Sequence, residues 1–119
     1  MSNLKNKRVI TAALCGSWAT KDMNPAVPYT PEEIARDAYE CWKAGAAIVH
    51  IHVRNADGSP STKFELYKET IERIRAFPDC DVCLNITSSG SVDFGDEERI
   101  YPLQQLLPER FLSCRREPV

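Results

Sequence analysis

The stretch Ala46-Ala47-Ile48-Val49-His50-Ile51-His52-Val53-Arg54 decides the fold class of this chain. It is a short apolar run rich in β-branched residues, which is typical of a strand buried in a sheet. Successive side chains of a strand point to opposite faces, so His50 and His52 share one face. Two imidazoles on a rigid element are the first two ligands that a divalent metal needs. The motif alone fits equally well with two structural histidines that are satisfied by hydrogen bonds.

A strand and a helix are expected before the histidine strand. Residues 8–14 form the expected first strand, and residues 17–29 form a long loop. Thr30, Pro31 and Glu33 predict the start of a helix, because they match a capping box with proline at the first helical position. The helix continues with apolar residues at helical spacing and ends near a glycine that favours a left-handed conformation: Ile34, Ala38, Cys41, Trp42 and Gly45.

The same alternation continues after the histidine strand. A turn over 55–61 leads into a helix that ends before Pro78 and has one apolar face, formed by Phe64, Tyr67, Ile71 and Ile74. A third strand is expected over 82–87. A third helix is expected over about 96–107, where Pro102 is acceptable only if the helix begins close to it. This β-α-β-α-β-α order predicts an α/β fold with a parallel sheet and right-handed crossovers.

Polar residues gather where the expected strands end. Asn85 and Thr87 alternate with apolar residues and share one strand face, and we expect a common polar pocket with the two histidines, because parallel sheets keep their chemistry at the carboxyl ends of the strands. The loop Thr87-Ser88-Ser89-Gly90 is also compatible with a nest of backbone amides for a carboxylate or phosphate.

Composition narrows the class of protein. The chain has 119 residues, 27% of them charged, and a formal net charge of −2, which argues against nucleic acid as a partner. No run approaches a membrane span and no secretion signal is evident, so we expect a cytoplasmic protein without a membrane partner. The five cysteines read as reduced core residues. A zinc or redox role for the lone Cys80-x-x-Cys83 pair is disfavoured, because redox pairs usually open a helix.

The run from Ile10 to Gly90 resembles the N-terminal part of the β-keto acid cleavage enzymes. The motifs that carry the resemblance are Thr11-Ala12-Ala13 with Gly16, the segment 24–35, Ala44-Gly45-Ala46 leading into His50-Ile51-His52-Val53-Arg54, Asp57-Gly58 with Pro60 and Ser61, and Asn85-Ile86-Thr87-Ser88-Ser89-Gly90. The resemblance implies the N-terminal part of a (β/α)8 TIM barrel, with about three of its eight units within residues 1–109.

The resemblance also implies a site and a reaction. His50 and His52 match two ligands of one zinc ion, and Thr87 stands where the family has a serine near the reacting centre. The residues expected to bind substrate are Asn85, Ser88, Ser89, Gly90 and Arg54. The implied reaction converts a β-keto acid and acetyl-CoA to acetoacetate and a new acyl-CoA through a retro-Claisen cleavage. Zinc suits this chemistry because a Lewis acid stabilises enolate-like charge.

Two departures from the family pattern matter. Trp18 stands where some members carry a glutamate, so we expect an apolar or aromatic tail on the keto acid instead of an amino group. The family's third ligand, a glutamate, and its acid/base groups come from later strands. Residues 110–119 are atypical and read as an out-of-frame tail or a gene-model error. We therefore expect the chain as given to be truncated, marginally stable and inactive, whereas full-length relatives are expected to be homo-oligomers. The alternative is a small non-catalytic α/β module with structural histidines.

Overall fold

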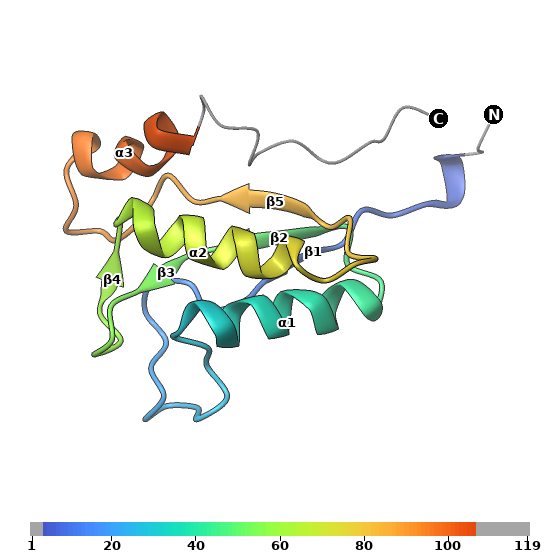
Figure 1. Cartoon of the computed structure of the whole chain (residues 1–119), viewed down its shortest axis with the longest axis horizontal. Coiled ribbons are helices and arrows are strands. Elements are labelled where there is room, and N and C mark those ends of the chain that lie inside the picture. Colours follow the sequence, from blue (N-terminus) through green and yellow to red (C-terminus); the bar gives the residue numbers. More distant parts are fainter. Residues whose placement is uncertain (1–3, 107–119) are drawn as a thin grey trace.

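A three-stranded parallel sheet forms the centre of the chain. The computed structural model describes residues 4–106, from a short 3-10 helix (η1, Leu4–Asn6) to the end of the last helix. The strands are β1 (Thr11–Ala13), β2 (Ile48–Ile51) and β5 (Cys83–Ile86), in the order β1-β2-β5, and both pairings are parallel. The histidine strand β2 is therefore central, with a neighbour on each side (Figure 1).

Two helices cover one face of this sheet. The helices α1 (Pro31–Lys43) and α2 (Phe64–Arg75) connect successive parallel strands and lie side by side (Figure 1). They bury one continuous apolar core against the sheet, formed by Ile34, Ala35, Ala38, Val49, Ile51, Val53, Tyr67, Ile71, Ile74, Cys80, Val82, Leu84 and Ile86. Both crossovers return on the same side because parallel strands need a right-handed connection.

The sequence signals for the helices are confirmed. The Thr30 hydroxyl accepts a hydrogen bond from the Glu33 amide at 3.1 Å, and Glu33 Oε2 accepts one from the Thr30 amide at 3.2 Å. This is the reciprocal capping box, with Pro31 as the first helical residue. Gly45 follows the helix at φ 115°, the left-handed conformation expected of a glycine at a helix end. The apolar face expected for the second helix is the buried face of α2.

Three expectations about boundaries are wrong. The first strand covers three residues and not seven, because only Thr11–Ala13 pair with β2. The stretch 46–54 is not one strand: the ladder with β5 ends at Ile51, and β3 (Val53–Arg54) pairs instead with the antiparallel β4 (Pro60–Ser61). The helix α3 (Asp96–Leu106) holds Pro102 seven positions in, at a buried site, so burial of the ring offsets the lost backbone hydrogen bond.

The other face of the sheet has no helix among residues 4–106. Thr11, Ala13 and Asn85 point to this face and are exposed. The observed architecture is thus a compact α/β arrangement of parallel strands, as the element order predicts. The expected end of the third helix at residue 107 and the atypical segment 110–119 lie outside the described residues.

Candidate metal and substrate site

The two histidines lie at the carboxyl end of the central strand. His50 is the third residue of β2 and is in register with Ala13 on one side and Asn85 on the other. His52 comes directly after the last residue of β2, where the chain leaves the parallel sheet. The predicted side-by-side arrangement is observed, with His50 Nε2 and His52 Nε2 3.1 Å apart.

Asn85 fixes the orientation and tautomer of the His50 ring. His50 Nδ1 lies 2.6 Å from Asn85 Oδ1. Since an amide oxygen only accepts hydrogen bonds, Nδ1 carries the proton and Nε2 presents its lone pair. A hydrogen-bond acceptor at one ring nitrogen fixes the tautomer and orientation of a histidine, so that the other nitrogen can bind a metal ion.

His52 is held neutral by its surroundings. Burial lowers its pKa to about 4, and the electrostatic effects of the neighbouring His50 and Arg54 side chains act in the same direction. The backbone of Gly90 lies near the ring and acts in the opposite direction, raising this pKa by the smallest of the four effects. Gly90 has φ 60°, and a Cβ there would lie 2.6 Å from Phe94 Cδ2, so only glycine fits at this point of the loop. With Nε2 of His52 directed at His50, the other ring nitrogen is the one available to Gly90.

The histidine pair fits a bound cation. The Nε2 lone pair of His50 faces His52 Nε2 across 3.1 Å, so the two nitrogens can share either a proton, as a hydrogen bond, or a cation. Two nitrogens that each bind one zinc ion at about 2.0–2.1 Å can have this separation. Within residues 4–106, however, no third His, Cys, Asp or Glu side chain joins the pair.

The loop after β5 lies beside the histidines but turns its polar groups in several directions. Thr87 is 3% exposed, and its hydroxyl accepts a hydrogen bond from the Ser89 amide at 3.0 Å. Ser88 and Ser89 are exposed. The structure therefore brings His50, His52, Asn85 and the Gly90 backbone together, with Thr87 buried next to this group along the chain. The catalytic role expected for Thr87 and the binding roles expected for the serines stay predictions.

Arg54 is engaged by backbone carbonyls. It is 2% exposed, and its guanidinium donates to Gly16 O at 2.9 Å, Gly58 O at 2.8 Å, Cys15 O at 3.2 Å and Ala19 O at 2.9 Å. Direct substrate binding by this side chain stays a prediction. In the structure its hydrogen bonds go to the loop after β1 and to the β3–β4 turn.

Sequence reasoning missed two residues, of which one contacts His52 and the other contacts Arg54. Cys15, taken as a core cysteine, donates from Sγ to the His52 carbonyl at 3.5 Å, and burial raises the pKa of its thiol. Tyr29, taken as part of a long loop, packs its ring beneath Arg54 and accepts a hydrogen bond from the Lys21 amide at 2.8 Å. The only sequence signal for either was its place near the carboxyl end of a strand or the start of a helix.

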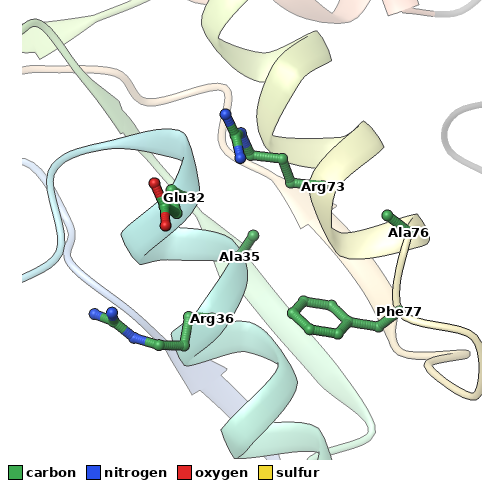
Figure 2. A pocket seen from close by; sticks show the side chains of 6 residues that line it. All are labelled: Glu32, Ala35, Arg36, Arg73, Ala76 and Phe77. Atoms are coloured by element: carbon green, nitrogen blue, oxygen red, sulfur yellow. The ribbon is translucent and has the colours of Figure 1, made fainter.

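A surface groove between α1 and α2 is a separate feature. It is lined by Glu32, Ala35, Arg36, Arg73, Ala76 and Phe77 (Figure 2). These residues come from the helical layer, whereas His50 and Asn85 share the opposite face of the sheet. The groove is therefore no part of the histidine site.

Comparison with known proteins defines the class. The family model described as beta-keto acid cleavage enzyme matches residues 7–115. The parallel α/β fold and the histidine pair at the end of β2 agree with the motifs through which the sequence resembles this family. The chain belongs to the β-keto acid cleavage enzyme family, and this is a family of enzymes.

Individual relatives show how much of such a protein is covered. The chain is 48% identical over 107 residues to a 3-keto-5-aminohexanoate cleavage enzyme of Fusobacterium nucleatum, with 89% of this chain and 38% of that protein aligned. It is 42% identical over 99 residues to a 3-dehydrocarnitine:acetyl-CoA trimethylamine transferase of Rhizobium meliloti, and the alignment covers 81% of this chain and 33% of that protein. A 3,5-dioxohexanoate:acetyl-CoA acetone transferase of Paraburkholderia graminis is 38% identical over 106 residues, covering 88% and 34%. The chain thus spans about a third of the length of these relatives.

Two further expectations concern the environment of the protein. In the described part of the chain, the helices are all too short or too polar to cross a membrane. Among residues 4–106, Cys15 and Cys80 are buried, and Cys41 and Cys83 are partly buried. The Cys80-x-x-Cys83 pair runs into β5 and does not open a helix.

Proposed function

We propose that this chain contributes the zinc-binding histidines of a β-keto acid cleavage enzyme with a (β/α)8 barrel. The observation that carries the proposal is the pair of Nε2 atoms 3.1 Å apart, with Nδ1 of His50 turned toward the Asn85 amide oxygen. Three parallel strands cannot close a barrel, and the exposed face that holds Asn85 would become part of its interior. A cytoplasmic location and homo-oligomers of the full-length enzyme belong to the same proposal.

The proposed reaction exchanges acyl groups between a β-keto acid and acetyl-CoA. The bond between the keto carbon and the adjacent CH2 breaks, that CH2 forms a bond to the acetyl carbonyl carbon, and the CoA sulfur moves to the released acyl group. The products are acetoacetate and a new acyl-CoA, with no change in oxidation state. The relatives named as acetyl-CoA transferases support acetyl-CoA as the co-substrate.

The residues of this chain would divide the work at the site. His50 and His52 would hold zinc, which when bound supplies Lewis-acid stabilisation of the enolate-like charge. Asn85 orients His50 through the 2.6 Å contact, and the Gly90 backbone lies near His52. We propose that the backbone amides of the loop 87–90 bind the substrate carboxylate and that Thr87 lies near the reacting carbon.

Substrate preference follows from the loop after β1. Trp18 is 81% exposed on this loop and offers an apolar surface without a charge. We propose a keto acid with an apolar or aromatic tail. Turnover measured on a series of keto acids should favour such tails, and a clear preference for the 5-amino substrate would contradict this part of the proposal.

A third zinc ligand would have to come from outside residues 4–106, because the described part of the chain offers none beside the histidines. Stable sites use three or four protein ligands. We therefore propose that the 119-residue chain on its own binds zinc weakly and lacks turnover. A cooperative thermal transition together with normal turnover would contradict this.

Zinc titration tests the site directly. We expect calorimetry on the wild-type chain to show one zinc ion bound, and His50→Ala and His52→Ala each to abolish this binding. Cys80→Ala is the matched control. It removes one thiol of the Cys80-x-x-Cys83 pair and should leave zinc binding unchanged. If zinc binding survives His50→Ala but is lost in Cys80→Ala, the metal is elsewhere and the histidines are structural, as in the alternative of a non-catalytic module.

A further inference from the structure

The buried Arg54 side chain links the loop after β1 to the β3–β4 turn. We propose that Arg54 is a positioning residue for substrate binding: it fixes the loop 15–19, which carries Trp18, against the edge of the sheet where the histidines lie. The inference rests on the proposed function for its substrate and assigns Arg54 a role through the backbone instead of direct substrate contact.

The hydrogen bonds of Arg54 join separate segments. Nε donates to Gly16 O, and Nη2 donates to both Cys15 O and Ala19 O, so three carbonyls of one loop converge on the guanidinium. Nη1 donates to Gly58 O in the β3–β4 turn. Four of the five N–H groups of a planar fork are thus used in fixed directions. Lysine has three donors on a single nitrogen and cannot reach the same four oxygens.

A second layer of contacts supports the guanidinium. The Tyr29 ring lies 5.3 Å from its central carbon, and the Tyr29 hydroxyl holds the Lys21 amide. Glu33 Oε2 accepts from the Tyr29 amide at 2.7 Å, which ties this layer to the start of α1. Gly58 has φ 87°, and any Cβ there would collide with the Tyr29 ring, so the turn can approach this closely only as glycine.

The same loop touches the histidine site and carries a free side chain. Cys15, whose carbonyl Arg54 holds, donates its thiol to the His52 carbonyl. Trp18 lies between Gly16 and Ala19, whose carbonyl oxygens each accept a hydrogen bond from Arg54 at 2.9 Å. Trp18 itself is 81% exposed. The backbone of the loop is therefore ordered while its indole remains available. This combination is what a substrate-binding residue on a loop requires.

This arrangement predicts that metal and substrate respond differently to a change at Arg54. The His50 ring is oriented by Asn85 and the Gly90 backbone lies near His52, and neither contact involves the loop 15–19. Loss of the clamp should therefore leave zinc affinity nearly unchanged and weaken the binding of a keto acid. A purely structural role would lower stability without separating these two affinities.

The test compares Arg54→Lys with two controls in the 119-residue chain. Arg73→Lys makes the same chemical change at an exposed arginine paired with Glu69. Ile74→Val removes one methylene from the core of α2 and serves as a control for reduced stability. The first readout is trypsin cleavage after Lys21 under native conditions, followed by mass spectrometry, since Lys21 lies two residues after Ala19, the last residue of the loop that Arg54 holds. The second is calorimetric titration with zinc and then with acetoacetate.

We expect Arg54→Lys to increase the rate of cleavage after Lys21 at least about 10-fold, because more than one charge-assisted hydrogen bond is lost. Acetoacetate affinity in the zinc-loaded chain should fall about 10-fold while zinc affinity stays within about threefold, and neither control should show this separation. Unchanged cleavage after Lys21, or an equal loss of acetoacetate binding in Ile74→Val, would overturn the proposal.

The test also covers a variant that does not fold and a wild-type chain that does not bind zinc. Should Arg54→Lys fail to fold, Tyr29→Leu removes the ring beneath the guanidinium and the acceptor of the Lys21 amide. It should then increase cleavage after Lys21 in the same direction, and unchanged cleavage would count against the clamp. If the wild-type chain binds no zinc, the proposed function fails, while the cleavage comparison still decides whether Arg54 orders the loop.

Discussion

Replacing Asn85 by leucine removes the acceptor that orients His50 and keeps the shape of the side chain nearly constant. Asn85 Oδ1 lies 2.6 Å from His50 Nδ1, which is a short contact, and Asn85 is exposed on the open face of the sheet. Without this acceptor, the ring can rotate and the proton can move to Nε2, the nitrogen that faces His52. A metal would then have to restore the tautomer before it binds.

The expected loss of zinc affinity follows from the short contact between Asn85 and His50 and from the exposure of Asn85. Loss of a partner that orients a ligating histidine typically costs 10–100-fold in metal affinity, or about 1.4–2.7 kcal/mol. Because Asn85 is exposed, water can replace part of the lost hydrogen bond, so we expect a value near the lower end, about 10-fold. Asn85→Asp keeps the acceptor and adds a negative charge, so zinc should bind at least as tightly as to the wild-type chain.

Competition with a chelator of known zinc affinity measures the zinc affinities of the wild-type chain, Asn85→Leu and Asn85→Asp on one scale. The thermal transition without metal is the control, since Asn85 is exposed and its replacement should change stability little. The reasoning is refuted if the leucine variant binds zinc as tightly as the wild-type chain, or if aspartate weakens binding as much as leucine does.

Three further predictions concern stability. Glu33 has a lowered pKa, chiefly because it accepts the Tyr29 amide, so its stabilisation is present above its ordinary pKa of 4.5 and is lost as the pH falls through the folded value; thermal melts of Glu33→Gln and wild type should differ at pH 7 and converge in acid. Ile71→Ala, at a fully buried position of α2, should lower the free energy of unfolding by about 2–5 kcal/mol in urea titrations, and a loss below 1 kcal/mol would contradict the core assignment. Tyr67→Phe should cost less than about 1 kcal/mol in the same assay, because the buried Tyr67 hydroxyl makes no hydrogen bond of good geometry within residues 4–106 and its interaction with the Val53 backbone is weak.

The helices and the order of the strands could be predicted because local signals determine them. The capping box at Thr30 and Glu33 and the apolar period of α2 act within a few residues of sequence, and the structure contains both. Alternation along the strand was also enough to place His50 and His52 side by side. The contact between His50 and Asn85 follows from both residues standing at the ends of neighbouring parallel strands.

The contacts around Arg54 could not be predicted because they depend on backbone carbonyls. A carbonyl is present at every residue, so no composition or spacing marks Cys15, Gly16, Ala19 and Gly58 as partners. The end of β2 at Ile51 was missed because the apolar and β-branched residues on both sides of it favour a strand, and the competing pairing of Val53 with Ser61 interrupts the parallel ladder. Pro102 shows the reverse case, in which tertiary burial overrides a strong local signal against a helix.

Because α1 and α2 run in the same direction, their dipoles change the electrostatic potential at one edge of the sheet. This effect extends further than any single contact. Both helices begin at the edge of the sheet where β2 ends in the histidines, so their positive dipole ends lie on the same side of the molecule (Figure 1). Each end acts like about half a positive charge. The resulting field attracts carboxylates and phosphates toward this edge and opposes a lone cation there. A metal ion and an anionic acid would therefore favour each other's binding at the histidines, each offsetting the charge that the other brings.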